Sequence, residues 1–255
     1  MSMPLTFRPA SDCPERARRI AAALIAGGLA SMEEHDPGGL VLTCGPEGLT
    51  LTARGTDQPL SLYLDFVRGP QGYRLAHAGQ AREDLIRALG RLPKGSTVID
   101  ASTGLGRDAL VLAARGYRVI ALERHPILAA LLSDALQRAA GHPALEPALA
   151  RLDFRQADAG EWLAENDTLF DAAVFDPMFP PRSKDAAVKK EMQVLQRLLG
   201  ANPDPDAPAT LAALRRHVRR RVVVKRPLHA PHVGDQTPAH ELRGRSTRFD
   251  IYLPV

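Results

Sequence analysis

A glycine-containing turn between an apolar strand and a helix is the feature that most limits how this chain can fold. The turn, Asp100-Ala-Ser-Thr-Gly-Leu-Gly-Arg-Asp108, follows a short buried strand expected at 97–100 and opens a helix expected at 108–114. Glycines let the backbone pass close to a ligand, and the first turn of a helix offers free N–H groups. The turn therefore predicts either a ligand-binding loop or a purely structural connection at a strand-to-helix junction.

From about residue 80 onward, the pattern of apolar residues alternates between strands and helices. Further strands are expected at 118–123, 152–156, 172–175 and 221–225, and helices at 83–89, 126–140, 189–199 and 211–218. The end of the chain, 241–253, has the pattern of a hairpin that turns near Gly244. This alternation predicts an α/β fold with a doubly wound, mainly parallel sheet.

The first third of the chain has a different organisation. A helical stretch at 14–30 precedes two β-prone runs, 40–43 and 49–52, which flank Gly45-Pro-Glu-Gly48 and predict a hairpin. A third strand is expected at 61–67, ended by Gly69-Pro-Gln-Gly72. We therefore expect residues 1–78 to form a small α+β lobe and residues 79–255 to form the α/β domain.

Composition excludes several classes of protein. Of 255 residues, 45% are hydrophobic and 24% charged, which excludes wholesale disorder, a collagen-like repeat and a disulfide scaffold. Only two cysteines, Cys13 and Cys44, are present, too few for a Cys-only metal site, and they favour a reducing compartment. The longest apolar stretch, 20–30, is too short to cross a bilayer and lacks a signal-cleavage pattern. These features predict a cytoplasmic protein with no membrane partner.

Basic residues are unevenly distributed along a chain of net charge +4. Between Arg215 and Arg226 there are seven arginines or lysines and no acid, and a second group comprises Arg182, Lys184, Lys189 and Lys190. Such clusters can neutralise the phosphates of a nucleic acid, although a solvated helix face gives the same pattern.

Carboxylates at defined distances from the glycine turn indicate which ligand it would take. The third glycine of the dinucleotide fingerprint is missing, whereas Asp100 lies four residues before Gly104, as is typical of S-adenosylmethionine enzymes. Glu123 ends the next strand, 17 residues after Gly106, where a carboxylate can accept hydrogen bonds from both ribose hydroxyls. Asp158 follows the third strand, beside the expected adenine. Surface or helix-capping roles for Glu123 and Asp158 remain alternatives.

The most specific motif is Asp176-Pro-Met-Phe-Pro180, directly after the strand expected at 172–175. It is similar to the [DN]-P-P-[FYW] motif of methyltransferases that act on planar amines, with Met178 in place of the second proline. The Asp176 carboxylate and the Pro177 carbonyl can accept the two N–H bonds of such an amine, and Phe179 can stack on the base. The alternative is a proline-rich turn without function.

Several segments together identify a family. Ile99–Ala109, Leu122–Pro126, Asp176–Pro180, Val188–Gln193, Val222–Pro227 and Arg248–Tyr252 resemble, in this order, the bacterial 16S rRNA methyltransferases that modify N2 of guanine 1516. The resemblance runs from about residue 40 to the end, and Ser102 stands where we expect alanine.

The resemblance implies a class I methyltransferase fold and S-adenosyl-L-methionine as cofactor. It implies cofactor contacts at the glycine turn and at the strand ends, and an acid that faces both cofactor and target amine. The implied cofactor-binding residues are Asp100, Gly104, Gly106, Arg107, Asp108, Glu123, Arg124, Asp158, Ala159 and Asp176, and the implied catalytic residues are Asp176, Pro177 and Phe179. No metal is implied, and the histidines are scattered along the sequence.

The resulting hypothesis is S-adenosylmethionine-dependent methylation of the exocyclic N2 amine of a guanine, with 16S rRNA or the small ribosomal subunit particle as partner. An N6-adenine or protein-amide methyltransferase is the alternative among enzymes, because the Asp-Pro-x-Phe motif serves all three. A catalytically silent RNA-binding relative is the alternative from another class.

Overall fold

The computed structural model describes residues 5–33, 39–55, 59–76, 83–178, 190–200 and 204–255, which form two compact units. Unit 1 comprises residues 1–65, 126–139 and 179–203, and unit 2 comprises the remainder. Both units are discontinuous in sequence, whereas the domains expected from the sequence, 1–78 and 79–255, are contiguous. That boundary stays a prediction, and the two units are described separately below.

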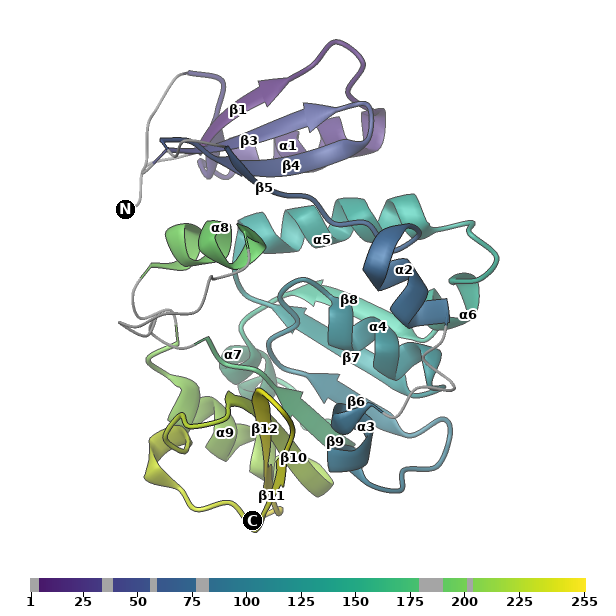
Figure 1. Ribbon diagram of the computed structural model, residues 1–255, viewed down its shortest axis with the longest axis vertical. Coiled ribbons are helices and arrows are strands. Elements are labelled where there is room, and N and C mark those ends of the chain that lie inside the picture. Colours follow the sequence, from purple (N-terminus) through teal and green to yellow (C-terminus); the bar gives the residue numbers. More distant parts are fainter. Residues whose placement is uncertain (1–4, 34–38, 56–58, 77–82, 179–189, 201–203) are drawn as a thin grey trace. The chain divides into compact units, whose positions relative to one another are not determined.

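Unit 1 is a five-stranded sheet with helices. Its strands are β1 (Leu5–Pro9), β2 (Ala30–Ser31), β3 (Leu40–Gly45), β4 (Gly48–Ala53) and β5 (Leu60–Leu62), in the order β2-β1-β3-β4-β5 (Figure 1). Its helices are α1 (Glu15–Ala26), α5 (Pro126–Ala139) and α8 (Lys190–Leu199). The expected hairpin is confirmed as β3 and β4, antiparallel with Gly45 opposite Gly48. The expected third strand is shorter, and β1 was not expected.

A buried carboxylate anchors this hairpin to α5. Asp134 is fully buried, and its Oδ2 accepts hydrogen bonds from the Leu49 amide at 3.1 Å and from Arg138 Nε at 3.0 Å. Gly48 has φ +125°, and a Cβ at this position would lie 2.3 Å from Asp134 Oδ2. A glycine is therefore required at this point, both for its backbone conformation and for the space that the carboxylate occupies.

The two cysteines form a disulfide in unit 1. Cys13 precedes α1 and Cys44 lies in β3, with their Cα atoms 5.4 Å apart. The Ala10 amide donates to the Cys44 carbonyl at 2.7 Å, which holds the chain after β1 against the end of β3. From the sequence, the cysteines indicated only a reducing compartment, and their pairing was not expected because the contact depends on β1.

Unit 2 contains a seven-stranded sheet. Its strands are β6 (Thr97–Asp100), β7 (Arg118–Glu123), β8 (Leu152–Gln156), β9 (Phe170–Phe175), β10 (Val218–Pro227), β11 (His240–Arg243) and β12 (Thr247–Tyr252), in the order β11-β12-β10-β9-β6-β7-β8. Strands β8, β7, β6, β9 and β10 are parallel to one another, and β12 is antiparallel to both of its neighbours. This is the expected mainly parallel sheet, ended by the expected hairpin.

Helices cover both faces of this sheet, because neighbouring residues of a strand point to opposite sides. Val98 belongs to a core with α3 (Asp84–Leu89), α4 (Arg107–Ala114) and α6 (Glu146–Leu149). Ile99, the next residue, belongs to a second core with α7 (Ala159–Ala164) and α9 (Ala207–Arg216). Unit 2 also contains α2 (Gly69–Ala76), where a strand-ending turn was expected, and a short 3₁₀ helix (Val233–Asp235). The doubly wound fold is confirmed.

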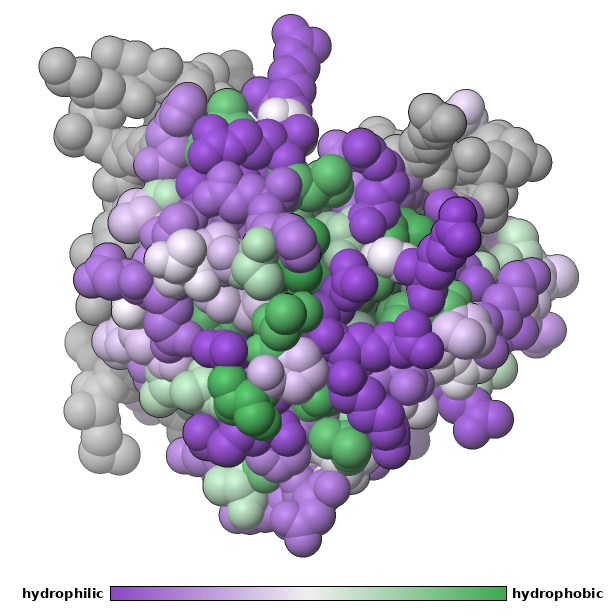
Figure 2. Space-filling model, turned by 90° about the horizontal axis from the view of Figure 1, so that it is seen from below, coloured by the Kyte–Doolittle hydropathy of each residue, from purple (hydrophilic) through white to green (hydrophobic). Residues whose placement is uncertain are grey.

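Figure 2 shows one face of the molecule, on which hydrophilic residues dominate and hydrophobic ones occur in small scattered groups. Within the part of the chain that the structure describes, no helix is both long enough and apolar enough to cross a membrane.

Candidate active site

Three strands of unit 2 end in acidic residues at one edge of the sheet. Asp100 ends β6, Glu123 ends β7, and Asp176 directly follows β9. These strands are parallel, and β6 pairs with β7 on one side and with β9 on the other. Ligands of open α/β sheets bind where the strand order reverses in this way, beyond the carboxyl ends of the strands. The carboxylates that the sequence singled out are therefore gathered at the expected place.

The glycine turn after β6 needs its glycines. Gly104 has φ +55° and Gly106 has φ +73°, in the left-handed region that side chains disfavour. Gly106 directly precedes α4, and its amide donates to the Thr103 carbonyl at 2.9 Å. The loop is thus a compact turn that delivers the chain to the amino end of a helix, where backbone N–H groups are available to a ligand.

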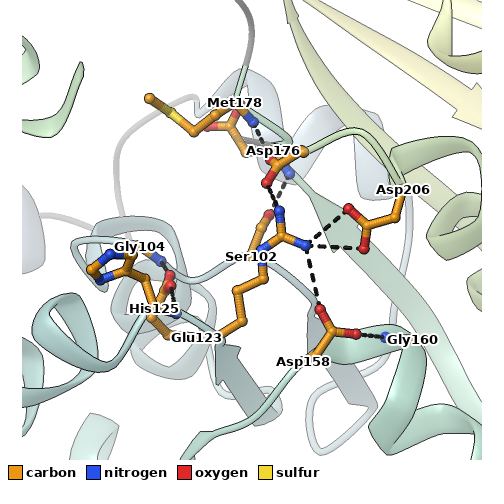
Figure 3. Close-up of polar contacts among 11 residues, drawn as sticks. Ser102, Gly104, Glu123, His125, Asp158, Gly160, Asp176, Met178 and Asp206 are labelled. Atoms are coloured by element: carbon orange, nitrogen blue, oxygen red, sulfur yellow. Dashed lines mark hydrogen bonds and ion pairs between the residues drawn. The ribbon is translucent and has the colours of Figure 1, made fainter. Parts of the chain in front are cut away.

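Glu123 holds the glycine turn in place. Its Oε2 accepts a hydrogen bond from the Gly104 amide at 2.8 Å, and its Oε1 accepts one from the His125 amide at 2.7 Å (Figure 3). The residue is 7% exposed, and burial raises the pKa of its carboxyl group. Each oxygen keeps a second lone pair that can accept a hydrogen bond from a ligand hydroxyl. Its place at the turn is as expected, and its contact with ribose stays a prediction.

Asp100 is a buried acid with little local compensation. It is 3% exposed, and its Oδ1 accepts a long hydrogen bond, 3.3 Å, from the Ser102 amide. Burial, with the charge of Asp108 nearby, raises the pKa of Asp100 to about 8. Its carboxyl group is therefore largely protonated at neutral pH, and a cationic ligand group beside it would favour the ionised form.

Arg124 is held by three acids. Its guanidinium bonds to Asp158 at 3.4 Å, to both oxygens of Asp206 at 2.9 Å, and to Asp204. Asp158 also caps α7, since its Oδ1 accepts from the amides of Gly160 and Glu161 (Figure 3). The capping alternative for Asp158 is thus observed, and cofactor contacts by Arg124 and Asp158 stay predictions.

Asp176 is positioned through its backbone and left accessible at its side chain. The Asp176 amide donates to Ser102 Oγ at 2.7 Å, so the serine at position 102, where alanine was expected, fixes the start of the motif. The Asp176 side chain is 43% exposed, and its Oδ2 accepts from Lys225 Nζ at 2.8 Å. Its Oδ1 has no hydrogen-bond partner among the described residues.

The motif after Asp176 is only partly described. Met178 donates its amide to Asp204 Oδ2, which ties the motif to the segment before α9. Pro177 lies between these two fixed points, whereas Phe179, the expected stacking residue, lies outside the described residues. Ala159 is buried at the start of α7, and Arg107 starts α4, where its carbonyl accepts from Gln71 at 3.4 Å. The roles of these four residues, Pro177, Phe179, Ala159 and Arg107, stay predictions.

Asp108 lies between two cations. Its Oδ1 bonds to Arg74 at 2.9 Å and its Oδ2 bonds to Lys225 at 2.9 Å. Arg74 also binds both oxygens of Glu83, at 2.9 and 2.8 Å. A row of alternating charges therefore leads from Glu83 to Asp176 by way of Arg74, Asp108 and Lys225. The cofactor contact expected of Asp108 stays a prediction, and Lys225 was not expected at the site.

Most of the basic run 215–226 is used inside the protein. Among its members, Arg219 and Arg221 donate to the carbonyls of Leu169 and Ala88 at 2.6 and 3.2 Å. Arg215 donates to the Leu253 carbonyl at 2.8 Å. Of the second basic group, Lys190 begins α8 and is exposed, and Arg182, Lys184 and Lys189 lie outside the described residues.

Among the described residues, one set of potential metal ligands comes together, although the histidines are scattered in sequence. His232, Glu241 and Asp250 have ligand atoms within 4.8 Å of one another. Arginine engages the two acids, since Arg248 binds Asp250 at 2.6 and 2.8 Å and Arg243 binds Glu241 at 2.7 and 2.9 Å. This donor set is therefore already paired with cations, and the expectation that no metal is needed stays a prediction.

The fold and the glycine turn define a class I S-adenosylmethionine-dependent methyltransferase. A family model described as putative SAM-dependent methyltransferase matches residues 27–254. A solved SAM-dependent methyltransferase from Neisseria gonorrhoeae is 29% identical and superposes with a TM-score of 0.76, covering 98% of this chain and 96% of that one.

Relatives identify the family more closely. Ribosomal RNA small subunit methyltransferase J of Thioalkalivibrio sulfidiphilus is 42% identical over 253 residues, 98% of this chain and 97% of that one. The enzyme of the same name from Alkalilimnicola ehrlichii is 44% identical over 212 residues, 80% of this chain and 79% of that one. The chain belongs to the ribosomal RNA small subunit methyltransferase J family of SAM-dependent enzymes. The similarity to the Thioalkalivibrio enzyme covers nearly the whole chain, so it extends upstream of residue 40, the point from which the resemblance was expected to run.

Proposed function

We propose that this enzyme transfers the methyl group of S-adenosylmethionine to the exocyclic N2 amine of a guanine in 16S rRNA. The names of its relatives support rRNA of the small subunit as substrate. The observation that carries the assignment of the site is Asp176, whose backbone amide is fixed by Ser102 at the carboxyl edge of the sheet. Its Oδ1 accepts no hydrogen bond from the described residues.

Residues around the glycine turn fit the cofactor. Asp100 is a buried carboxyl group that forms no direct ion pair with the described residues, which suits a ligand that carries an ammonium and a sulfonium. Glu123 presents two carboxylate oxygens at the end of β7, which suits a ribose with two hydroxyls. When bound, S-adenosylmethionine supplies an electrophilic methyl group on its sulfonium.

The chemical task of the protein is mainly orientation. A guanine N2 amine shares its lone pair with the ring and is a weak nucleophile. The Asp176 carboxylate accepts one N–H bond and the Pro177 carbonyl the other, which aims the nitrogen lone pair for an in-line displacement. Positive charge develops on the nitrogen during transfer, and a carboxylate already in place stabilises it. A strong base is not required, because the methylated nitrogen carries a positive charge and readily loses its extra proton after the transfer.

The partner that follows from this proposal is 16S rRNA, either free or within the small ribosomal subunit particle, and the compartment is the cytoplasm, where that RNA is assembled. Lysines that follow the Asp-Pro-Met-Phe motif in the sequence, Lys184, Lys189 and Lys190, would neutralise RNA phosphates.

The test is methyl transfer in vitro from labelled S-adenosylmethionine to 16S rRNA and to small subunits, both from cells that lack this protein. Nuclease digestion and mass spectrometry identify the product. We expect N2-methylguanosine at one position, a much slower reaction with Asp176→Ala, and a clear preference for one of the two substrates. If the product is N6-methyladenosine or a methylated protein, the proposal is wrong and the corresponding alternative activity is supported. Tight RNA binding without cofactor binding would indicate a silent relative.

A further inference from the structure

We infer that Lys225 is a positioning residue for Asp176, whose ammonium group occupies one carboxylate oxygen and thereby presents the other to the target amine. This inference rests on the proposed role of Asp176 in the transfer reaction. Lys225 lies in β10, and Asp176 follows β9, which is parallel to β10 and hydrogen-bonded to it. The two side chains therefore meet at the same edge of the sheet.

The contact with Lys225 gives the two carboxylate oxygens of Asp176 different surroundings. Lys225 Nζ lies 2.8 Å from Oδ2, whereas Oδ1 makes no hydrogen bond to the described part of the chain. A carboxylate held at one oxygen cannot rotate freely, so the direction of the other oxygen is fixed before the base arrives. Pre-organisation of this kind lowers the cost of orienting the substrate.

A second acid holds the ammonium itself. Lys225 Nζ is 2.9 Å from Asp108 Oδ2, and Asp108 is in turn bound by Arg74 at 2.9 Å. The ammonium is thus fixed between residues of α4 and of the β9 end. Burial opposes its charge, but the two carboxylates raise the pKa of Lys225, so it stays protonated throughout the working range.

Asp176 needs this cation because acids surround it. Asp108 on α4, Asp100 at the end of β6 and Asp204 before α9 all face the same region, and Arg226 is the neighbouring cation on β10. Desolvation raises the pKa of Asp176, and Lys225 is the group that lowers it most. Without Lys225, a larger fraction of Asp176 would be protonated, and a protonated carboxyl group is a poorer acceptor for an amine N–H.

The test compares Lys225→Met with Lys225→Arg, and uses Lys225→Gln in place of the Met variant if that one does not fold. Gln removes the charge and keeps a polar side chain with an N–H donor. The readouts are single-turnover methylation of the rRNA substrate between pH 5.5 and 9, S-adenosylmethionine affinity by calorimetry, and thermal unfolding of the same samples. Lys225→Arg is the matched control that preserves the charge.

In the neutral variant we expect the acidic limb of the pH–rate profile to move upward by about 1 to 3 pH units, the usual effect of one nearby opposite charge. At saturating S-adenosylmethionine, its rate should fall at the acidic end of the measured pH range and recover as the pH rises. The Arg variant should keep the wild-type profile.

A folded neutral variant with the wild-type profile would overturn the inference. A loss of cofactor affinity without a shift of the acidic limb of the pH–rate profile would also overturn it, because Lys225 would then be a cofactor contact. Failure of both neutral variants to fold would show a structural role and also overturn it. Asp176→Asn separates this inference from the proposed function: if that variant transfers methyl at the wild-type rate, the role of Asp176 itself is wrong.

Discussion

The carboxylate of Glu123 joins the end of β7 to the Gly104 amide, 2.8 Å away. The same side chain that is expected to bind the ribose therefore also sets the shape of the turn that is expected to bind the rest of the cofactor. Removing it should affect cofactor binding through both contacts.

Glu123→Ala should weaken S-adenosylmethionine binding about tenfold or more, because hydrogen bonds to a charged group contribute about 1.5–3 kcal/mol. Glu123→Gln keeps one acceptor oxygen, so its Kd should lie between those of the wild type and Glu123→Ala. Asp153→Ala is the matched control, since Asp153 is an exposed acid on β8 that binds Arg155 on its own strand. Calorimetric titration measures all four proteins, and an unchanged Kd for folded Glu123→Ala would contradict the assignment.

Asp176→Ala should lower kcat by about 10²–10⁴, the range for loss of one pre-organised polar group, with little change in cofactor affinity. Asp176→Asn should be milder, because an amide oxygen still accepts a hydrogen bond. Single-turnover methylation and thermal unfolding of the same samples provide the measurement. If Asp176 instead only stabilises its own turn, the Ala variant will unfold early and lose cofactor binding as well.

The raised pKa of Asp100, about 8 against an ordinary 3.8, makes cofactor binding depend on pH. Binding of a cation requires the carboxylate, so affinity for S-adenosylmethionine should increase as the pH rises toward 8 and level off above it. In the free protein the sign is opposite: protonated Asp100 stabilises the fold fully below about pH 4, and this contribution disappears as the pH passes 8. Asp100→Asn should flatten both dependences. Calorimetry in buffers of different ionisation enthalpy would detect the released proton, and no proton release in wild type would refute the prediction.

Lys184, Lys189 and Lys190 should matter more to RNA binding than Arg215 and Arg216. Replacing the three lysines together should reduce the slope of log K against log salt by about two to three, at about 0.7–0.9 for each phosphate that is no longer neutralised. Arg215 already donates to the Leu253 carbonyl within the protein. The comparison is a salt titration of rRNA binding for the triple variant and for the paired arginine variant. Equal slopes in the triple variant and wild type would show that these lysines do not neutralise RNA phosphates and are only solvated.

Gly48→Ala should destabilise the protein by more than about 1 kcal/mol, because alanine disfavours φ +125° and its Cβ would meet the Asp134 carboxylate. Gly55→Ala is a matched control. Gly55 also has a positive φ, +76°, but no atom lies within 4 Å of the added Cβ. The difference in unfolding free energy between the two variants contains the clash with Asp134 and the greater backbone strain at φ +125°. Similar values for both variants would contradict the prediction.

Regular alternation made the larger sheet predictable. Buried runs such as β7 have a period and length that distinguish strands from helices, and turn residues mark their ends. Helix α2 was missed because Gly69-Pro-Gln-Gly has the composition of a turn, although proline also fits the first turn of a helix. Strand β1 was missed because its partners, β2 and β3, are distant in sequence.

The candidate site also contains residues that the sequence could predict and residues that it could not. Residues at strand ends, such as Asp100 and Glu123, were predictable because parallel strands carry their carboxyl ends to one edge. The position of Lys225 at the site was not predictable, because it depends on an ion pair with Asp108, 117 residues earlier. Ser102 carries no motif signal either, and its hydroxyl acquires a role only when β6 and β9 lie side by side.

The hydrogen bond from Leu49 to Asp134 spans 85 residues, and it has a consequence for the order in which the newly made chain can fold. As the protein leaves the ribosome, the first hairpin emerges long before α5, so the Leu49 amide has no carboxylate to meet. Unit 1 must then wait for sequence that lies between β7 and β8 and, in α8, beyond β9. A nascent chain stopped after residue 78 would therefore expose the surface that α5 covers in the complete unit.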